Sequence, residues 1–168
     1  YQEEQKTYNL VVNDTHNYFA NNILVHNKIC RFCFTYDTMI TLSDGTYQKI
    51  CKVRPGDMIK TYNEDTGKLQ NSKVLETVKI LHDNIVKYKF DNNTIIETTD
   101  NHPFYVVDEG YKAPLQIGDV VLNDEMNKLT LVNIEVDKKQ QITYNINSTD
   151  NGKNYFANKV LVSDESDT

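Results

Sequence analysis

The sequence lacks a long apolar run and any segment rich in basic residues. No apolar run approaches the ~18 residues that a bilayer-spanning helix needs, and mean hydropathy is −0.60. The 18 Lys and Arg residues are outnumbered by 24 Asp and Glu residues, and they are not clustered. Nucleic-acid binding relies on clustered cations that neutralise phosphates. We therefore expect neither nucleic acid nor membrane as a partner.

Cysteine is also scarce, with only Cys30, Cys33 and Cys51. Three cysteines cannot all pair, so a small disulfide scaffold is excluded and a reducing, cytoplasmic compartment is the default expectation. The start, Tyr-Gln-Glu-Glu, lacks the basic region of a secretory signal. The Cys-x-x-Cys spacing of Cys30 and Cys33 leaves two alternatives open, a redox pair or half of a zinc site.

Most of the local sequence patterns predict β-strands. Short β-like runs alternate with turn signals such as Ser43-Asp44-Gly45, a pattern typical of an all-β fold. One helical turn is possible over residues 112–116. His82 is interpreted as a surface residue. The predicted strands cover residues 38–42, 47–50, 58–62, 73–80, 85–90, 94–99, 104–107, 120–122 and 129–136.

An internal repeat is the most informative feature. Tyr8-Asn9-Leu10 followed by residues 17–25 recurs as Tyr144-Asn145-Ile146 followed by residues 154–162, with one residue inserted in the second copy. The copies diverge at their ends, where His26-Asn27 corresponds to Ser163-Asp164. Two copies near opposite ends of the chain do not form a solenoid. They are interpreted as two versions of one closing segment.

Several sequence blocks carry a resemblance to a known superfamily. They are residues 33–38, residues 50–59 with Pro55-Gly56-Asp57, residues 98–106 with Thr99-Asp100-Asn101-His102, residues 116–119, and residues 14–20 with Val25-His26-Asn27. Together they resemble the Hint superfamily of inteins, hedgehog autoprocessing domains and bacterial intein-like domains. The resemblance implies a horseshoe-like, all-β Hint fold with two-residue-turn hairpins and pseudo-two-fold symmetry. It also implies single-turnover, autocatalytic self-processing without a cofactor, acting on flanking host domains of the same chain.

The first reactive junction is the Phe32–Cys33 bond. A cysteine thiolate can attack its own preceding carbonyl, which converts the amide into a thioester. His102 suits the role of proton donor to the departing amine, and Thr99 can bond the nearby backbone. Each residue alone also fits a structural role, as a buried cysteine, a core histidine and a strand threonine. Their joint order favours the catalytic interpretation.

The second reactive junction is the Asn27–Lys28 bond. The Asn27 carboxamide can close on its own carbonyl, giving a succinimide, with His26 and His16 as acid–base candidates. Inteins carry Cys, Ser or Thr after this asparagine, and here it is Lys28. Cleavage is therefore expected to predominate over ligation. In the second copy Asp164 offers only a poor nucleophile, so that junction should be slow or inactive.

The order of the blocks predicts a Hint domain over residues 33–164. Residues 1–27 are then a surplus closing segment, residues 28–32 a junction peptide and residues 165–168 an acidic tail. Three arrangements remain open for the surplus segment. It ends an upstream tandem copy, it displaces residues 144–164 from the same barrel, or it docks into a second molecule as a strand-swapped homodimer.

Two alternative functions share the same β signals. One is a catalytically silent Hint module that only binds or links its neighbours. The other is a gated version of the self-processing domain. In that version Cys30 and Cys33 form a disulfide, or Cys30, Cys33 and His102 hold an inhibitory zinc ion.

Overall fold

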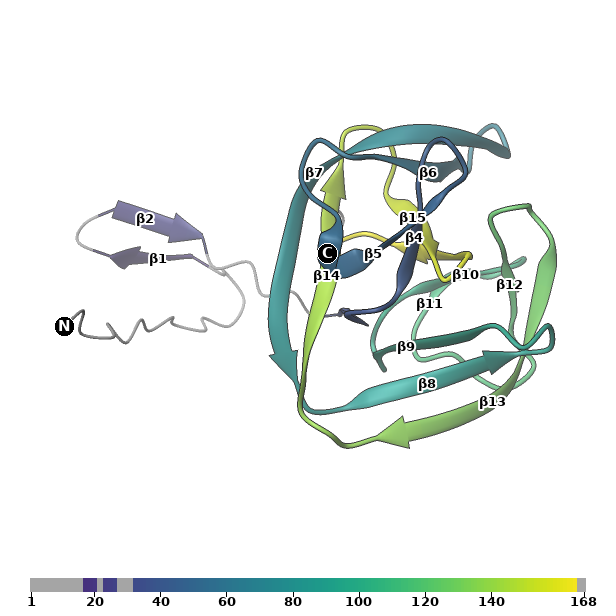
Figure 1. Cartoon of the computed structure of the whole chain (residues 1–168). Coiled ribbons are helices and arrows are strands. Elements are labelled where there is room, and N and C mark those ends of the chain that lie inside the picture. The colour runs from purple at the N-terminus through teal and green to yellow at the C-terminus, as the bar shows by residue number, and fades with distance from the viewer. Residues whose placement is uncertain (1–16, 21–22, 27–31, 166–168) are drawn as a thin grey trace.

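The computed structural model describes residues 17–20, 23–26 and 32–165, with side chains for residues 32–165. Nearly every element is a strand (Figure 1). The one helical segment in the described part of the chain is a single 3-10 turn, η1 (Ile50–Lys52). The predicted all-β class is confirmed.

Sixteen strands follow one another along the described residues. They are β1 (Asn17–Ala20), β2 (Ile23–His26), β3 (Phe34–Thr35), β4 (Met39–Thr41), β5 (Tyr47–Lys49), β6 (Met58–Asn63), β7 (Lys68–His82), β8 (Ile85–Phe90), β9 (Ile95–Thr99), β10 (Phe104–Val106), β11 (Gly110–Lys112), β12 (Val120–Leu122), β13 (Lys128–Asp137), β14 (Gln141–Thr149), β15 (Asn154–Ala157) and β16 (Val160–Ser163).

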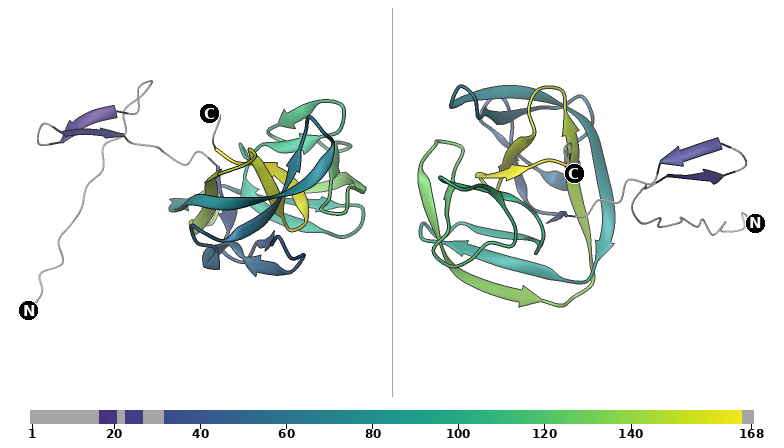
Figure 2. Two further views of the ribbon diagram at one scale, coloured as in Figure 1. Left: turned by 90° about the horizontal axis from the view of Figure 1, so that it is seen from above. Right: turned by 180° about the vertical axis from the view of Figure 1, so that it is seen from behind.

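Fourteen of these strands form one antiparallel sheet that curls round on itself (Figure 2). Its order is β5-β4-β15-β16-β10-β12-β13-β8-β9-β3-β14-β7-β6, and β11 pairs with β10. The two ends of this order approach each other, because Leu42, next to β4, forms a bridge with Ile59 of β6. Strands β1 and β2 pair with each other in a sheet of their own.

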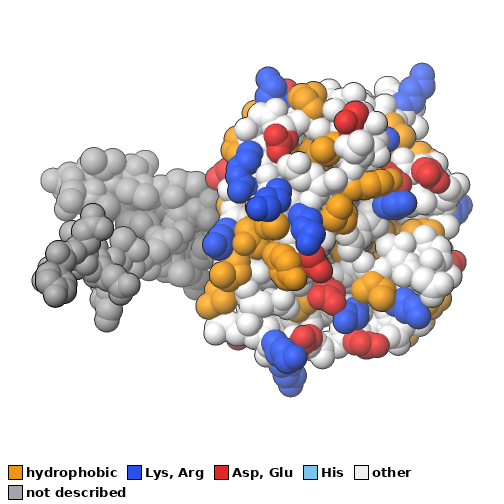
Figure 3. Space-filling view, viewed as in Figure 1, with side chains coloured by type: hydrophobic (Ala, Val, Ile, Leu, Met, Phe, Trp, Pro, Cys, Tyr) orange, Lys and Arg blue, Asp and Glu red, His pale blue; other side chains and the backbone are white. Residues whose placement is uncertain are grey.

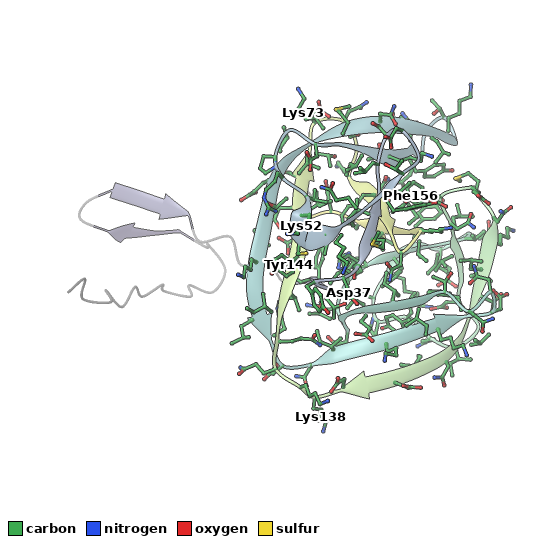
Figure 4. All side chains as sticks on the ribbon, in the orientation of Figure 1. Asp37, Lys52, Lys73, Lys138, Tyr144 and Phe156 are labelled. Atoms are coloured by element: carbon green, nitrogen blue, oxygen red, sulfur yellow. The ribbon has the colours of Figure 1, made fainter. Side chains whose placement is uncertain are left out.

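The curled sheet encloses a core of aromatic and branched side chains. Phe34, Phe90, Phe104 and Tyr155 are fully buried in its main cluster. A smaller cluster contains Phe156, which Figure 4 labels, with Leu122 and Leu161. Alternating inward positions on antiparallel strands supply such a core. Strands β3, β9 and β16 thereby become fixed around one region of the interior.

Two tight turns form the connections of the hairpins β4–β5 and β15–β16, which matter for the site. The predicted turn around Gly45, with φ of +84°, connects β4 and β5. Asn158 and Lys159, with φ of +45° and +70°, form the two-residue turn between β15 and β16. Positive φ at both central positions matches the right-handed twist of the flanking strands.

The structure differs from the sequence prediction in two places. Residues 112–116 form no helical turn, because the residue before Pro114 is pushed toward extended backbone. Strand β7 extends well beyond the expected residues 73–80, because it pairs along its length with both β6 and β14.

Charged side chains of both signs are interspersed on the face seen in Figure 3. Within residues 17–20, 23–26 and 32–165, no helix has the length and apolar character needed to cross a membrane.

Candidate active site

Cys33 lies directly before β3, where the chain enters the core. Strand β3 pairs with β9 through Phe34 and Thr98, and with β14 on its other side. Cys33 is fully buried, and Thr99, the last residue of β9, exposes 4% of its surface. The position of Cys33 is therefore fixed by the sheet rather than by a loop.

Two threonines hold the backbone of Cys33. The Cys33 amide, whose nitrogen belongs to the Phe32–Cys33 bond, donates to Thr99 Oγ1 at 3.0 Å. The Cys33 carbonyl accepts from Thr98 Oγ1 at 2.9 Å and from the Thr99 amide at 2.9 Å. Both sides of Cys33 are thus oriented by neighbouring hydrogen bonds.

His102 completes the group. A turn after β9 brings it back, and its amide donates to the Thr99 carbonyl at 3.2 Å. Its ring centroid lies 4.6 Å from that of Phe32 and 4.1 Å from that of Phe34. The imidazole therefore lies against the residue that supplies the carbonyl of the Phe32–Cys33 bond.

The protonation state of His102 follows from its surroundings. Burial lowers the pKa of His102 to about 3, and the hydrogen bond to the Ser163 carbonyl opposes this only in part. The ring is neutral at pH 7. Because a carbonyl only accepts, Nε2 donates to Ser163 O at 3.2 Å, which leaves Nδ1 as the unprotonated nitrogen. Nδ1 is buried and has no hydrogen-bond partner among residues 32–165.

The end of β16 reaches the same place from the other side of the core. Ser163 donates its amide to the Pro103 carbonyl at 3.0 Å, and Asp164 donates its amide to the Lys153 carbonyl at 2.8 Å. Asp164 and Glu165 each expose 1% of their surface. The second copy of the repeat therefore occupies the site next to His102.

A cavity of about 780 Å³ opens at this end of β16. Its lining includes Pro103, Tyr111, Asn154 and Ser163. Tyr111 donates to Glu64 Oε1 at 2.9 Å, and burial together with that carboxylate raises the pKa of Tyr111. Ser163, the last residue of β16, thus borders an open space lined by both polar and apolar groups.

The structure brings together three of the predicted site residues, Cys33, Thr99 and His102. His16, Asn27 and Cys30 lie outside the described residues, and for His26 only the backbone of β2 is described. Their roles stay predictions.

The zinc and disulfide gates also stay predictions, because both need Cys30. Among residues 32–165, no three His, Cys, Asp or Glu side chains are grouped to hold a metal ion.

Sequence reasoning missed two contacts of this site. Thr98 bonds the Cys33 carbonyl, and the Ser163 carbonyl accepts from His102. The adjacent Thr-Thr pair at the end of β9 was the available signal for Thr98. His82 also differs from expectation, since it is half-buried and its Nδ1 lies 2.6 Å from Thr143 Oγ1.

Comparisons with known proteins identify the family. A family model described as the pretoxin HINT domain matches residues 39–165. The chain belongs to this family. The match includes Thr99, His102 and the hairpin β15–β16, and it begins after Cys33.

Solved structures give the same result for the Hint fold. The chain is 28% identical to a bacterial intein-like domain from Clostridium thermocellum, with a TM-score of 0.73, covering 79% of this chain and 98% of that one. A DnaB intein from Synechocystis sp. PCC 6803 is 20% identical, with a TM-score of 0.70, covering 79% and 98%. The Ssp DnaB mini-intein variant M86 is 20% identical, with a TM-score of 0.69, covering 82% and 97%. No curated protein sequence matches the chain. At the family level, the Hint assignment implies self-processing.

Proposed function

We propose that this Hint domain breaks its own backbone at the Phe32–Cys33 bond by an N-to-S acyl shift. The observation that carries the proposal is the hydrogen bond from the Cys33 amide to Thr99 Oγ1, with the His102 ring packed on Phe32. A nucleophile, a group that orients the scissile nitrogen and a titratable ring are thus gathered at one peptide bond.

The neutral ring of His102 determines the order of proton transfers. With a pKa of about 3, His102 does not enter the reaction as an acid at pH 7. It first takes the proton of the Cys33 thiol, and the thiolate attacks the Phe32 carbonyl carbon. The imidazolium then gives the proton to the Cys33 nitrogen as the C–N bond breaks. The products are a thioester between Phe32 and the Cys33 sulfur and a free Cys33 amine, with no proton gained or lost.

Thr99 is proposed to orient the departing nitrogen. Its hydroxyl accepts the hydrogen of the Cys33 amide, which holds the plane of the scissile peptide relative to the ring of His102. Thr98 holds the other side of Cys33 through the carbonyl. A fixed geometry of this kind lowers the entropic cost of reaching the reactive arrangement.

We further propose cleavage after Asn27. The Asn27 carboxamide nitrogen attacks its own carbonyl carbon, a succinimide forms, and Lys28 leaves as a free amine with acid–base help from His26 and His16. Lys28 carries no hydroxyl or thiol to receive the acyl group. Release of flanking segments is therefore favoured over their ligation, and any ligation requires an amine to attack the thioester.

The proposed domain organisation follows from this chemistry. Residues 33–164 form the self-processing domain, and residues 1–27 supply the asparagine. Partners are flanking host domains in the same polypeptide. The description of the family as a pretoxin domain supports a toxin precursor as the host protein.

Fusion of a reporter domain to each end of the chain tests the proposal. After water or an added thiol cleaves the thioester, intact mass should show an upstream fragment that ends at Phe32, and Cys33→Ala should abolish it. Thr99→Ala should slow this cleavage by roughly 10²-fold, the lower end of what a positioned catalytic group contributes. Thr98→Ala is the matched control and should slow it less, because Thr98 bonds the carbonyl on the far side of Cys33. Undiminished cleavage in Cys33→Ala would refute the acyl shift.

A further inference from the structure

The chain contains two hairpins of the same sequence pattern, and their backbones pair in the same register. We refer to β1–β2 as the N-terminal hairpin and to β15–β16 as the closing hairpin. In the N-terminal hairpin the pairs are Asn17–His26, Tyr18–Val25, Phe19–Leu24 and Ala20–Ile23. In the closing hairpin they are Asn154–Ser163, Tyr155–Val162, Phe156–Leu161 and Ala157–Val160.

The closing hairpin is held in the core by two asparagines. Asn154 accepts the Tyr62 amide at 2.8 Å and donates to the Tyr62 carbonyl at 2.9 Å. Asn158 accepts the Met39 amide at 2.7 Å and donates to the Ile95 carbonyl at 2.8 Å. These bonds connect the hairpin to strands β6, β4 and β9.

Three large side chains complete the attachment. Tyr155 is fully buried and donates its hydroxyl to Asn145 Oδ1 at 2.5 Å. Phe156 and Leu161 are fully buried in the smaller core cluster with Leu122. Ala157 pairs with Ile40 of β4, where a small residue suits the packed interior.

Every residue named in these attachments has an identical counterpart in the N-terminal copy. The counterparts of Asn154, Tyr155, Phe156, Ala157, Asn158 and Leu161 are Asn17, Tyr18, Phe19, Ala20, Asn21 and Leu24. The differences fall elsewhere, at Asn22 for Lys159, Ile23 for Val160, His26 for Ser163 and Asn27 for Asp164. The two hairpins therefore share the residues that attach the closing hairpin to the core, but they differ in the residues at the reactive end.

We propose that the N-terminal hairpin exchanges with the closing hairpin in the same Hint core, and so delivers His26 and Asn27 to the place of Ser163 and Asp164 beside His102. This inference rests on the self-processing function, and it names the conformational step that brings Asn27 to the active site. The closing hairpin leaves the core in the exchange, and β14 stays paired with β7.

The chain connection is long enough for this exchange within one molecule. Ser163 and Phe32 both contact His102, through a hydrogen bond of 3.2 Å and a ring-centroid distance of 4.6 Å. Five residues, 28–32, lie between Asn27, which directly follows the N-terminal hairpin, and Cys33. Five extended residues reach about 17 Å. That span is enough to cover the distance between Phe32 and Ser163, since both contact the same imidazole ring.

The reactive end of the core can accommodate the replacement. Ser163 lines the cavity of about 780 Å³, which gives the larger His26 side chain space. Asp164 and Glu165 each expose only 1% of their surface. Asn27 places a neutral amide at the position of Asp164. Ile23 instead of the fully buried Val160 adds one methylene, which opposes the exchange.

A double-mutant cycle on the full chain tests the exchange without relying on cleavage. All variants carry Cys33→Ala and Asn27→Ala, so the chain stays intact. Phe156→Ala alone should lower Tm only slightly, because the N-terminal hairpin replaces the damaged one. Phe19→Ala alone should leave Tm unchanged, and the double variant should lose roughly 10 °C.

Additive effects overturn the proposal. If Phe156→Ala alone loses roughly 10 °C or fails to fold, and Phe19→Ala adds nothing, the two hairpins do not compete for the core. The matched pair Asn17→Ala and Asn154→Ala gives a milder second cycle that must agree. Light scattering must show a monomer for Phe156→Ala, since a dimer would place the N-terminal hairpin in a second copy and refute exchange within one molecule.

The cleavage assay separates this inference from the proposed function. With Asn27 restored, Phe156→Ala should raise the rate of cleavage after Asn27 at least several-fold, because more molecules hold the N-terminal hairpin in the core. A coupled Tm cycle without such cleavage supports the exchange and refutes asparagine cyclisation. Cleavage after Asn27 with an uncoupled cycle refutes the exchange.

Discussion

At the residue scale, the proposed chemistry depends on one imidazole, that of His102, in an unusual environment. The His102 ring packs against Phe32, Phe34 and Phe104, and its Nε2 is hydrogen-bonded to the Ser163 carbonyl. In the proposed mechanism the unprotonated, buried Nδ1 of this neutral ring accepts the thiol proton only transiently, because the low pKa of His102 makes it a weak base. The residue that the sequence predicts as a proton donor therefore first acts as a base in the proposed mechanism.

The lowered pKa of His102 predicts a pH effect on stability. In the unfolded chain an ordinary histidine takes up a proton below about pH 6.5, whereas folded His102 does so only near pH 3. This contribution to stability is complete above pH 6.5 and is lost as pH falls toward 3, at up to about 1.4 kcal/mol per pH unit. Urea unfolding at several pH values should show this slope, and His102→Gln should remove it.

Nitrogen NMR of the imidazole gives the direct check. The His102 ring should remain in its neutral form, protonated at Nε2, at pH 5. A ring that titrates near pH 6.5 in the folded protein would contradict both the burial argument and the proposed order of proton transfers.

At the element scale, the closing hairpin determines what happens at the downstream junction. It carries Ser163 and Asp164 to the position next to His102, where a histidine and an asparagine would be needed for cyclisation. The hairpin is well attached and chemically unsuited to cleavage. We therefore attribute the expected inactivity of this junction to these two side chains.

The double variant Ser163→His with Asp164→Asn tests this assignment. It should create cleavage after residue 164, with a fragment that ends in a succinimide and is lighter by one water than the hydrolysed acid. Mass spectrometry of a chain with a downstream reporter measures it, and Ser163→His alone is the control. An uncut double variant that folds normally would show that more than these two side chains is missing.

At the scale of the whole molecule, much of the fold was readable from local patterns. The runs at residues 85–90 and 120–122 match β8 and β12, and the turn at Gly45 forms where Asp-Gly predicts it. The grouping of Cys33, Thr99 and His102 was readable from the order of the blocks. Alternation and turn residues carry this information because strand faces and positive φ are local properties.

The remaining features of the site depend on contacts between residues that are far apart in the sequence. Thr98 reaches the Cys33 carbonyl across 65 residues, and His102 reaches the Ser163 carbonyl across 61. The pKa of His102 depends on burial, and two of the rings packed on it, those of Phe32 and Phe34, come from a distant segment of the chain. No pattern near His102 encodes these contacts, so neither its protonation state nor its hydrogen bond to the Ser163 carbonyl could be predicted.

The central claim is that Cys33 forms a thioester with Phe32. The most direct measurement is the intact mass of the upstream fragment after a chain with an upstream reporter is incubated with a small thiol. The account predicts a fragment that ends at Phe32 and carries the thiol as a thioester, absent from Cys33→Ala. An upstream fragment that ends at Phe32 as a plain acid, at the same rate with and without thiol and unchanged in Cys33→Ala, would contradict it.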